Sequence, residues 1–239
     1  MKKNHSKSQY LQEQLSKIIA LTEPGGRLRS EPKLAKDLGV SRATLREAMR
    51  TFETQGLIHR RQGSGTFVTH PSQVFESGLE ILESIETLAE RIGLPVQMGE
   101  MKAQKRSPTP EEAKALTLTE GANVIHVSRV IHTEDRPVAY LIDIVPDDLL
   151  HLEELHKDFT GSVLDLFLER GTPEMISSRC EITAVSAPVE VAKPMGLQRG
   201  DVLLKFVAYL FASDGRVVDY SFSYFLPGYF HFHVIRKIG

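Results

Sequence analysis

The feature that most constrains the fold is a pair of short helical patterns joined by a three-residue turn. Apolar residues recur at helical spacing over residues 30–38 and again over 41–54, and a glycine ends the first pattern. Ser30 and Ser41 stand where N-cap residues are favoured. Two short helices joined in this way form a helix-turn-helix, whose second helix enters the DNA major groove N-terminal end first. A further amphipathic helix is expected over residues 7–21.

The start of the second helix carries the candidate contacts to DNA. Four residues there are expected to face outward, namely Ser41, Arg42, Thr44 and Arg46. Arg42 and Arg46 lie four residues apart on one helix face, and arginine suits bidentate contact with guanine or phosphate. The alternative is that these arginines only form ion pairs with Glu31 or Glu47.

A glycine-rich hairpin follows in the stretch GLIHRRQGSGTFV, residues 56–68. Apolar and β-branched residues at both ends predict two short strands, and the glycines supply the positive φ angles of a tight turn. The donors and open backbone N–H groups near the tip suit an anionic surface. The candidate contacts are Arg60, Arg61, Gln62 and Gly63, and the alternative is a solvated hairpin with incidental charge.

Residues 25–68 resemble the winged helix-turn-helix of the GntR family of bacterial transcription regulators. The resemblance rests on SE-x-x-LA, on LGVSR-x-T-x-R-x-A and on GLI-x-RRQG-x-GTFV. It implies that the hairpin is the wing, with Gln62 and Gly63 reaching the minor groove or the adjacent backbone. The chain departs from the family at Pro32, where an arginine that contacts DNA is frequent, so a different base specificity is expected.

Charge divides the 239-residue chain into two parts. Residues 1–70 hold 13 Lys and Arg against 6 Asp and Glu, a net charge of +7, whereas residues 71–239 hold 16 against 25, a net charge of −9. A basic part joined to an acidic one predicts two domains with different partners, the first partner being anionic. We expect a DNA-binding domain over residues 1–70, a linker and helix over 71–95, and a second domain over 96–239.

Composition disfavours several other classes of protein. No apolar run approaches the roughly 18 residues of a membrane span, and the first residues lack the apolar core of a signal peptide, which predicts a cytoplasmic protein with no membrane partner. The one cysteine, Cys180, lies in a strand-like apolar segment and is interpreted as a buried thiol. His231 and His233 share one face of a strand, but a metal site needs a further ligand, for which His126 and His132 are the candidates. Neither a metal nor a cofactor is predicted.

The second part of the chain predicts an α+β fold with a mostly antiparallel sheet. Segments rich in β-branched and aromatic residues alternate with short helical segments. The expected strands are 124–131, 138–145, 175–185, 202–212 and 217–225, and the expected helices are 79–91, 110–116, 162–170 and 188–195. Residues 96–236 resemble the UTRA ligand-binding domain of the HutC subfamily, which has a chorismate-lyase-like fold. The matching pieces are GANVIHVSRVIHTEDRPVAY, SVLDLFLERG, LQRGDVLLKFVAYLFASDGRVVDYSFSYF and GYFHF.

This second resemblance implies an effector site between the sheet and the segment before the domain. The candidate residues are Ser84, Ile85, Glu86, Arg129, Ile131, Tyr140, Leu141, Asp219, Phe222 and Phe225. Members of the family that bind sugar phosphates tend to have a hydroxyl where this chain has Glu86 and a second arginine where it has Ile131. A carboxylate repels an anion, so we expect an unphosphorylated effector with hydroxyl or amine groups and a flat or apolar body. The alternative is that Phe222 and Phe225 are core residues and the contacts lie elsewhere.

The expected function is that of a homodimeric transcription regulator, a repressor that leaves double-stranded operator DNA when its small-molecule effector binds. No enzymatic activity is predicted, because no acid–base or nucleophile constellation stands out in the sequence. The alternatives are a small-molecule enzyme built on the second domain and a nucleoid protein that binds DNA without regulation. Turnover of the ligand would favour the first alternative, and sequence-selective binding released by one metabolite would exclude the second.

Overall fold

The structure of the protein is a computed structural model that describes residues 7–54, 57–61, 63–69, 75–133, 136–155, 159–198 and 200–235. The chain divides into two compact units, and each is described by itself. The first comprises Met1–Val74 and Leu226–His231, and the second comprises Phe75–Phe225 and Phe232–Gly239. The expected domain boundaries at residues 70 and 95 stay predictions.

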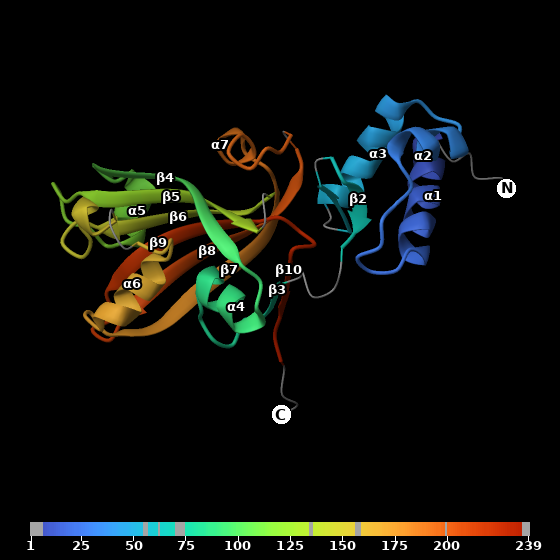
Figure 1. Cartoon of the computed structure of the whole chain (residues 1–239). Helices are drawn as coiled ribbons and strands as arrows, with labels where there is room; N and C mark the ends of the chain where they lie inside the picture. The colour runs from blue at the N-terminus through green and yellow to red at the C-terminus, as the bar shows by residue number, and fades with distance from the viewer. Residues whose placement is uncertain are drawn as a thin grey trace. The chain divides into compact units, whose positions relative to one another are not determined.

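In its described residues, the first unit folds into three helices and a hairpin (Figure 1). The elements are α1 (Lys7–Leu21), α2 (Glu31–Asp37), α3 (Arg42–Thr54), β1 (Ile58–Arg61) and β2 (Gly65–Val68). Their apolar sides meet in one core, which includes Leu11, Leu15, Leu34, Leu45, Met49, Phe52 and Ile58. The expected helix-turn-helix is confirmed, because α2 and α3 pack into this core on either side of Gly39, whose φ is +65°.

The wing is larger than the hairpin that the sequence predicts. β1 and β2 pair antiparallel along their whole length. The segment before α2 joins them, since the Leu28 N–H donates to the Thr66 carbonyl at 2.8 Å. Arg27 also forms an isolated β-bridge with Phe67. Gly65 makes room for this segment, because a Cβ at that position would lie 2.8 Å from the Arg27 Nε.

In the described residues, the second unit is built on a six-stranded antiparallel sheet with the order β4-β5-β6-β9-β8-β7. The strands are β4 (Val96–Arg106), β5 (Val124–Thr133), β6 (Arg136–Pro146), β7 (Met175–Ser186), β8 (Val202–Ala212) and β9 (Val217–Phe225). The expected α+β fold with a mostly antiparallel sheet is confirmed. The sequence patterns do not predict β4, nor the two-stranded sheet of β3 (Phe75–Gly78) and β10 (Phe230–His233).

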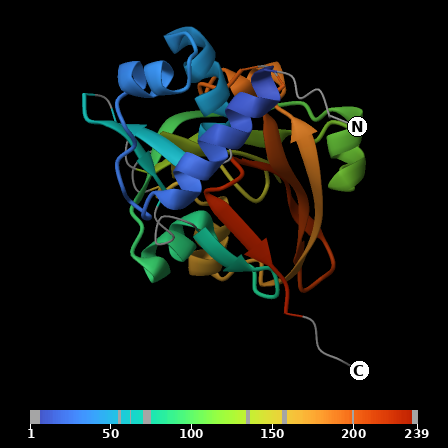
Figure 2. The same cartoon turned by 90° about the vertical axis from the view of Figure 1, so that its right-hand side faces the viewer.

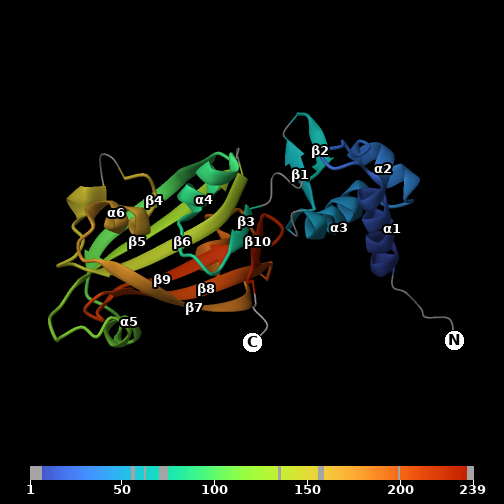
Figure 3. The same ribbon diagram turned by 90° about the horizontal axis from the view of Figure 1, so that it is seen from below.

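Helices cover both faces of the large sheet (Figures 1 and 3). α4 (Ile85–Ile92), α6 (Val163–Arg170) and the short η2 (Leu152–Leu155) belong to one face, which we call the α6 face. α5 (Pro110–Ala115) covers the other face, the α5 face, and α7 (Val189–Ala192) follows β7. Each face has its own core, which includes Phe167 of α6 on one face and Leu116 at the end of α5 on the other.

The helix before the sheet is shorter than the sequence predicts. Apolar spacing predicts a helix from Leu79, but α4 begins at Ile85. Ser84 is its N-cap and accepts a hydrogen bond from the Thr87 N–H at 2.9 Å. Leu79 is instead 42% exposed and follows β3, whose pairing with the distant strand β10 holds this segment outside the helix. The predicted end is confirmed, since Gly93 closes α4 with a left-handed φ of +70°.

Cys180 is exposed, which corrects the expectation of a buried thiol. It lies in β7, an edge strand whose side chains are exposed along most of its length. Apolar and β-branched residues predict the strand itself. They do not predict its place at the edge of the sheet, because that place depends on pairing with segments distant in the sequence.

Candidate DNA-binding and effector sites

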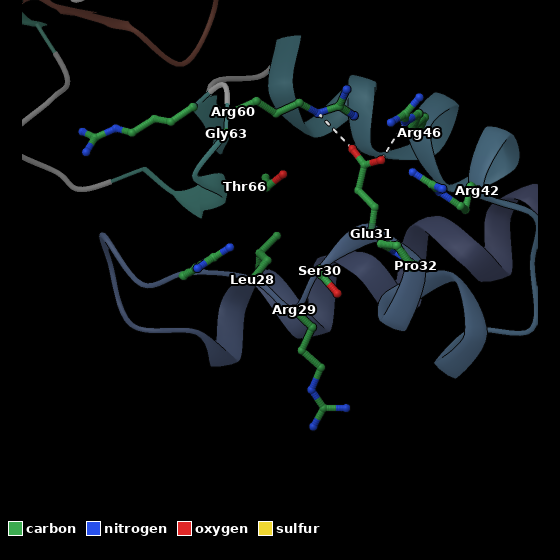
Figure 4. Close-up of a pocket in the computed structure, with 13 residues that line it drawn as sticks. Leu28, Arg29, Ser30, Glu31, Pro32, Arg42, Arg46, Arg60, Gly63 and Thr66 are labelled. Atoms are coloured by element: carbon green, nitrogen blue, oxygen red, sulfur yellow. Dashed lines mark hydrogen bonds and ion pairs between the residues drawn. The ribbon is translucent and has the colours of Figure 1, made fainter.

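A groove of about 540 Å³ lies between the wing and the first turns of α2 and α3 (Figure 4). Six arginines line it, namely Arg27, Arg29, Arg42, Arg46, Arg60 and Arg61, whereas Glu31 is the one acidic side chain in its lining. The groove therefore has a marked excess of positive charge. Such a surface suits a polyanion such as the backbone of DNA.

The start of α3 presents the residues that the sequence predicts there. All four candidates, Ser41, Arg42, Thr44 and Arg46, are exposed. The Ser41 Oγ caps the helix by accepting a hydrogen bond from the Thr44 N–H at 3.1 Å, and it lies 2.8 Å from the Thr44 hydroxyl. These contacts cap the first turn of α3, which carries Arg42, and Arg46 follows one turn later.

Glu31 connects the two basic elements of the groove. Its carboxylate accepts a hydrogen bond from the Arg46 Nε at 2.6 Å, and the Arg60 Nε lies 3.8 Å from its other oxygen (Figure 4). Arg60 also lies 3.6 Å from Glu53. The ion pair that the sequence offers as an alternative to DNA contact is therefore present in the free protein. It leaves Arg46 available, because that side chain stays 55% exposed and surface ion pairs are weak.

Sequence patterns miss two of the arginines that line the groove. Arg27 and Arg29 precede α2 and are not among the candidate contacts that the sequence patterns give. The signal was the run RLR directly before the N-cap residue Ser30. Arg29 forms an exposed ion pair with Asp37 at 2.8 Å, whereas Arg27 lies against the wing beside Gly65.

At the wing tip, the structure describes part of the predicted contact set. Arg61 ends β1, and its guanidinium carbon lies 5.6 Å from the centre of the Phe67 ring. Gly63 has a φ of +75°, as a tight turn requires. Gln62 lies outside the described residues, so its contact with DNA stays a prediction.

A second candidate site surrounds Arg129 on the α6 face of the sheet. Arg129 is only 4% exposed and forms an ion pair with Asp143 on the neighbouring strand. Its guanidinium carbon lies 6.0 Å from the centre of the Phe159 ring. The Arg129 Nε is buried and has no hydrogen-bond partner among the described residues. One donor of this buried cation is therefore unsatisfied.

Two further carboxyl groups lie close enough to interact with Arg129. Burial, followed by repulsion from the Asp143 carboxylate, raises the pKa of Asp219 well above its usual value. Asp219 accepts a hydrogen bond from the Ile144 N–H at 3.2 Å. Burial also raises the pKa of Glu86, against the attraction of Arg129, and the Glu86 Oε1 has no partner among the described residues. An unsatisfied acceptor therefore accompanies the unsatisfied donor of Arg129.

The first turn of α4 is tied to α6 beside this cluster. The Ser84 hydroxyl donates to the Asp165 carboxylate at 2.6 Å while it caps α4. Gly161 allows the Glu86 carboxylate to approach, because a Cβ at this glycine would lie 2.9 Å from the Glu86 Oε1. The Glu86 carboxylate of α4 thus lies beside Gly161, just before α6, and the neighbouring candidate Ile85 is partly buried.

Strand pairing separates the candidate residues into two groups. Arg129 lies opposite Leu141, and Ile131 lies opposite Ala139, which lies opposite Phe225. Residues directly opposite each other have side chains on the same face of the sheet. Asp219 lies opposite Leu210, which belongs to the core of the α6 face. Asp219 and these candidates therefore all lie on the α6 face. The buried side chains of Leu141 and Ile131 are apolar walls, and Phe225 packs edge-on against Phe206.

The other group contains Tyr140 and Phe222, which lie on the α5 face. Tyr140 pairs with Tyr224, and Phe222 pairs with Ile142 and packs in the core beside α5. The expectation of one pocket walled by Tyr140, Phe222 and Phe225 is therefore corrected. The physical reason is the alternation of side chains along a strand, which the odd spacing between Phe222 and Phe225 already signals.

Sequence patterns also miss three residues of the Arg129 site. Asp143 neutralises Arg129, Asp165 holds the Ser84 hydroxyl, and Phe159 lies over the guanidinium. Asp143 carries a signal in the sequence, since it is a lone acid inside the apolar run PVAYLIDIV. The other two lie on the connection and helix that cross the sheet, and only the fold brings them to Arg129.

Among the residues that the structure describes, no group of three or more His, Cys, Asp or Glu side chains is arranged to hold a metal ion. In the same part of the chain, no helix is long and apolar enough to cross a membrane.

Comparison with known proteins finds a family match for each unit. Residues 93–231 match the UTRA domain. Residues 9–68 match the family described as bacterial regulatory proteins, gntR family. The first range contains Arg129, Asp143 and Asp219 but not Ser84 and Glu86, and the second contains the arginine groove.

Individual relatives agree with these matches. The HTH-type transcriptional repressor NagR of Bacillus subtilis is 27% identical over 202 residues, which cover 84% of this chain and 82% of the relative. A histidine utilization repressor of Pseudomonas putida is 28% identical over 184 residues, which cover 76% of this chain and 71% of the relative. The crystal structure of PhnF from Mycobacterium smegmatis has a TM-score of 0.66 at 18% identity and covers 96% of this chain and 100% of that chain. This last likeness shows the fold alone.

Proposed function

Because the chain belongs to the gntR family of bacterial regulatory proteins and carries a UTRA domain, we propose that it is a ligand-responsive transcription repressor. The observation that carries the proposal is the groove in which six arginines surround one carboxylate. The groove is formed by the start of α2, the start of α3 and the wing, and a winged helix-turn-helix holds DNA with these elements. The relatives named as repressors support the direction of the regulation.

The repressor binds its operator as a homodimer in the cytoplasm, where bacterial DNA lies. A two-fold dimer presents two equivalent copies of α3, so the operator is expected to be an inverted repeat. Arg42 and Arg46 are the candidates for base contact in the major groove, and the arginines of the wing contact the backbone or the minor groove. Binding is expected to weaken steeply with salt, because neutralised phosphates release counterions.

The effector is a small, unphosphorylated molecule bound on the α6 face beside Arg129. Two observations support this class of ligand. First, the positive charge of Arg129 is already neutralised by Asp143. Second, the nearby groups Glu86 and Asp219 are carboxyls, so they supply no cation to bind a phosphate. The unsatisfied Glu86 Oε1 can accept a hydrogen bond from a hydroxyl or amine, while the Arg129 Nε can donate one.

Effector binding acts through α4, without turnover of the ligand. The Ser84 cap and Glu86 lie in the first turn of α4, so a ligand between Glu86 and Arg129 changes how this helix is held. A ligand held there would make different contacts in two positions of α4, and ligand-driven release requires such a difference.

Two linked experiments test the proposed function. Selection from a random DNA library, followed by footprinting, is expected to return an inverted repeat that is protected on both half-sites. A thermal-shift screen of metabolites then identifies stabilising ligands, and one of them is expected to release the protein from that site in a gel-shift assay. Recovery of no preferred sequence would refute the regulator proposal, and chemical conversion of the stabilising ligand would favour an enzyme.

A further inference from the structure

The outer side of β7 is an open strand edge. In the described part of the chain, β7 pairs with β8 on one side and no strand pairs with its other side, as the orange strand in Figures 2 and 3 shows. An open edge offers unpaired backbone groups to another chain, and proteins commonly protect such edges with lysine, proline or a bulge. β7 contains no lysine or proline, and its pairing with β8 is regular after a register shift between Met175 and Ser177. Its charged side chains Arg179 and Glu181 pair with each other, and Ile176 and Ile182 are 60% and 43% exposed.

The opposite edge of the same sheet is protected. β4 carries Lys102, Lys105 and Arg106, and its pairing with β5 shifts register between Met98 and Met101. Basic side chains and an irregular register both hinder the addition of a further strand. The contrast singles out β7 as the edge at which another strand fits.

Backbone geometry determines which residues of β7 such a strand would contact. The Ala187 N–H donates to the Asp201 carbonyl at 2.7 Å, which continues the β7–β8 register by one pair. Backbone groups point to alternate sides along a strand, so the odd-numbered residues of β7 bond to β8. The N–H and C=O groups of Ser178, Cys180 and Ile182 therefore point away from the sheet.

The charges on β7 favour one register for pairing with a second copy. Arg179 and Glu181 flank Cys180 and form an exposed ion pair. In an antiparallel pair centred on Cys180, each Arg179 lies opposite the partner's Glu181. A pair centred on Arg179 or on Glu181 would instead place like charges directly opposite each other, which is unfavourable.

We propose that β7 pairs antiparallel with β7 of a second copy of this chain, about a two-fold axis at Cys180. The six strands of each protomer then form one continuous sheet. The axis is perpendicular to that sheet, so both α6 faces, with their Arg129 sites, lie on the same side of it. This inference rests on the homodimer of the proposed function and names its interface.

Disulfide trapping tests the centre of the pair. Cys180 is the only cysteine in the chain, so a disulfide between two copies must join the two Cys180 residues. A hydrogen-bonded cross-strand pair has a Cα separation of about 5.5 Å, which lies within the range for a disulfide. Diamide, which accepts the two electrons and two protons, is expected to convert most of the dilute full-length protein into a linked dimer. The Cys180→Ser variant is the control and is expected to remain unlinked.

Moving the cysteine tests the register. In the Cys180→Ser background, two copies of the Ser178→Cys variant would hold their cysteines about 13 Å apart along the pair, too far for a disulfide. The Ile182→Cys variant is expected to behave in the same way. A mixture of the two variants is expected to form a linked heterodimer, because residue 178 of one copy lies opposite residue 182 of the other.

Charge reversal tests the same interface without a cysteine. Arg179→Glu is expected to weaken the dimer at least tenfold in sedimentation velocity, because four acidic side chains then meet at the axis. The double variant Arg179→Glu/Glu181→Arg restores alternating charges and is expected to regain most of the affinity. Lys102→Glu on β4 is the matched control and is expected to leave the dimer unchanged.

The outcomes separate this inference from the proposed function. A dimer that binds an inverted repeat, but neither links through Cys180 nor responds to Arg179→Glu, would refute the β7 interface and leave the regulator intact. A monomer that protects a single half-site would refute both the interface and the homodimer. Linking of Cys180, together with rescue by the double variant, would establish the β7 pair.

Discussion

Glu31 and Arg46 form an ion pair across the helix-turn-helix, with the Arg46 Nε 2.6 Å from the Glu31 carboxylate. The pair joins the first turn of α2 to the exposed face of α3. The same carboxylate attracts Arg60 of the wing, so one acidic side chain orients basic residues from two elements (Figure 4). An arginine that is held in place before DNA arrives loses less conformational entropy on binding.

Removal of Glu31 is expected to increase non-specific DNA binding and to reduce discrimination. In Glu31→Gln the groove loses its one carboxylate, so its affinity for unrelated DNA is expected to rise several-fold at low salt. Arg46 and Arg60 lose their restraint, so the ratio of operator to non-operator affinity is expected to fall. Fluorescence anisotropy with both DNAs measures the two effects. Glu47→Gln, an exposed position on α3 outside the groove lining, is the matched control, and an equal effect there would contradict a special role for Glu31.

Loss of Arg42 or Arg46 is expected to weaken operator binding by about 1–3 kcal/mol if the side chain makes a bidentate contact with a base. Both side chains are exposed, so the fold is expected to stay intact. A gel-shift series with Arg42→Ala and Arg46→Ala measures the loss, and circular dichroism checks the fold. Lys36→Ala, an exposed cation of α2 that does not line the groove, serves as the control. Wild-type affinity in both arginine variants would show that α3 is not the recognition helix.

Sugar phosphates are expected to bind poorly, and their unphosphorylated forms to be better ligands. The reason is the balance of charge around Arg129, which is paired with Asp143 and lies near Glu86. Glu86→Thr removes a carboxyl group and is expected to improve affinity for phosphorylated analogues, whereas Asp219→Ala is expected to weaken effector binding. Calorimetry with each pair of compounds decides the question. Micromolar binding of a sugar phosphate to the wild type, with its unphosphorylated form silent, would overturn this view of the site.

The buried carboxyl group of Asp219 is expected to make the protein less stable as pH rises. Burial raises the pKa of Asp219 in the folded state above the value of 3.8 expected for the unfolded chain. Between these two pKa values the Asp219 carboxyl is ionised in the unfolded chain but protonated in the folded protein. The free energy of unfolding therefore falls as pH rises through this range. Asp219→Asn cannot ionise and keeps an acceptor for the Ile144 N–H. Its free energy of unfolding relative to wild type is therefore expected to rise with pH, as urea titrations would measure.

Asp148 provides the opposite case as a control. Its hydrogen bonds with Arg216 lower the pKa of the Asp148 carboxyl, so this group contributes stability above pH 3.8 that is lost as pH falls through the lowered value. Asp148→Asn is expected to be less stable than wild type at neutral pH, with the difference disappearing in acid. A pH dependence of the same sign in both variants would contradict the burial of Asp219 as the cause.

Local patterns in the sequence were enough to predict the helix-turn-helix and most elements of the sheet. Ser41 and Ser84 cap helices by bonding to N–H groups three residues away, and Gly39 and Gly93 adopt positive φ angles that end helices. These interactions lie within a few residues of the chain, so residue type and spacing reveal them. The arginines at the start of α3 follow directly from the same patterns.

Only the tertiary structure decided which residues meet at the second site and at the edge of the sheet. Asp143 meets Arg129, and Tyr140 lies on the opposite face, because the pairing of β5 with β6 fixes both positions. Cys180 is exposed because β7 takes an outer place in a sheet whose strand order differs from the order in the sequence. These outcomes depend on pairing between segments tens of residues apart, where shifting the register by one residue moves every side chain to the other face.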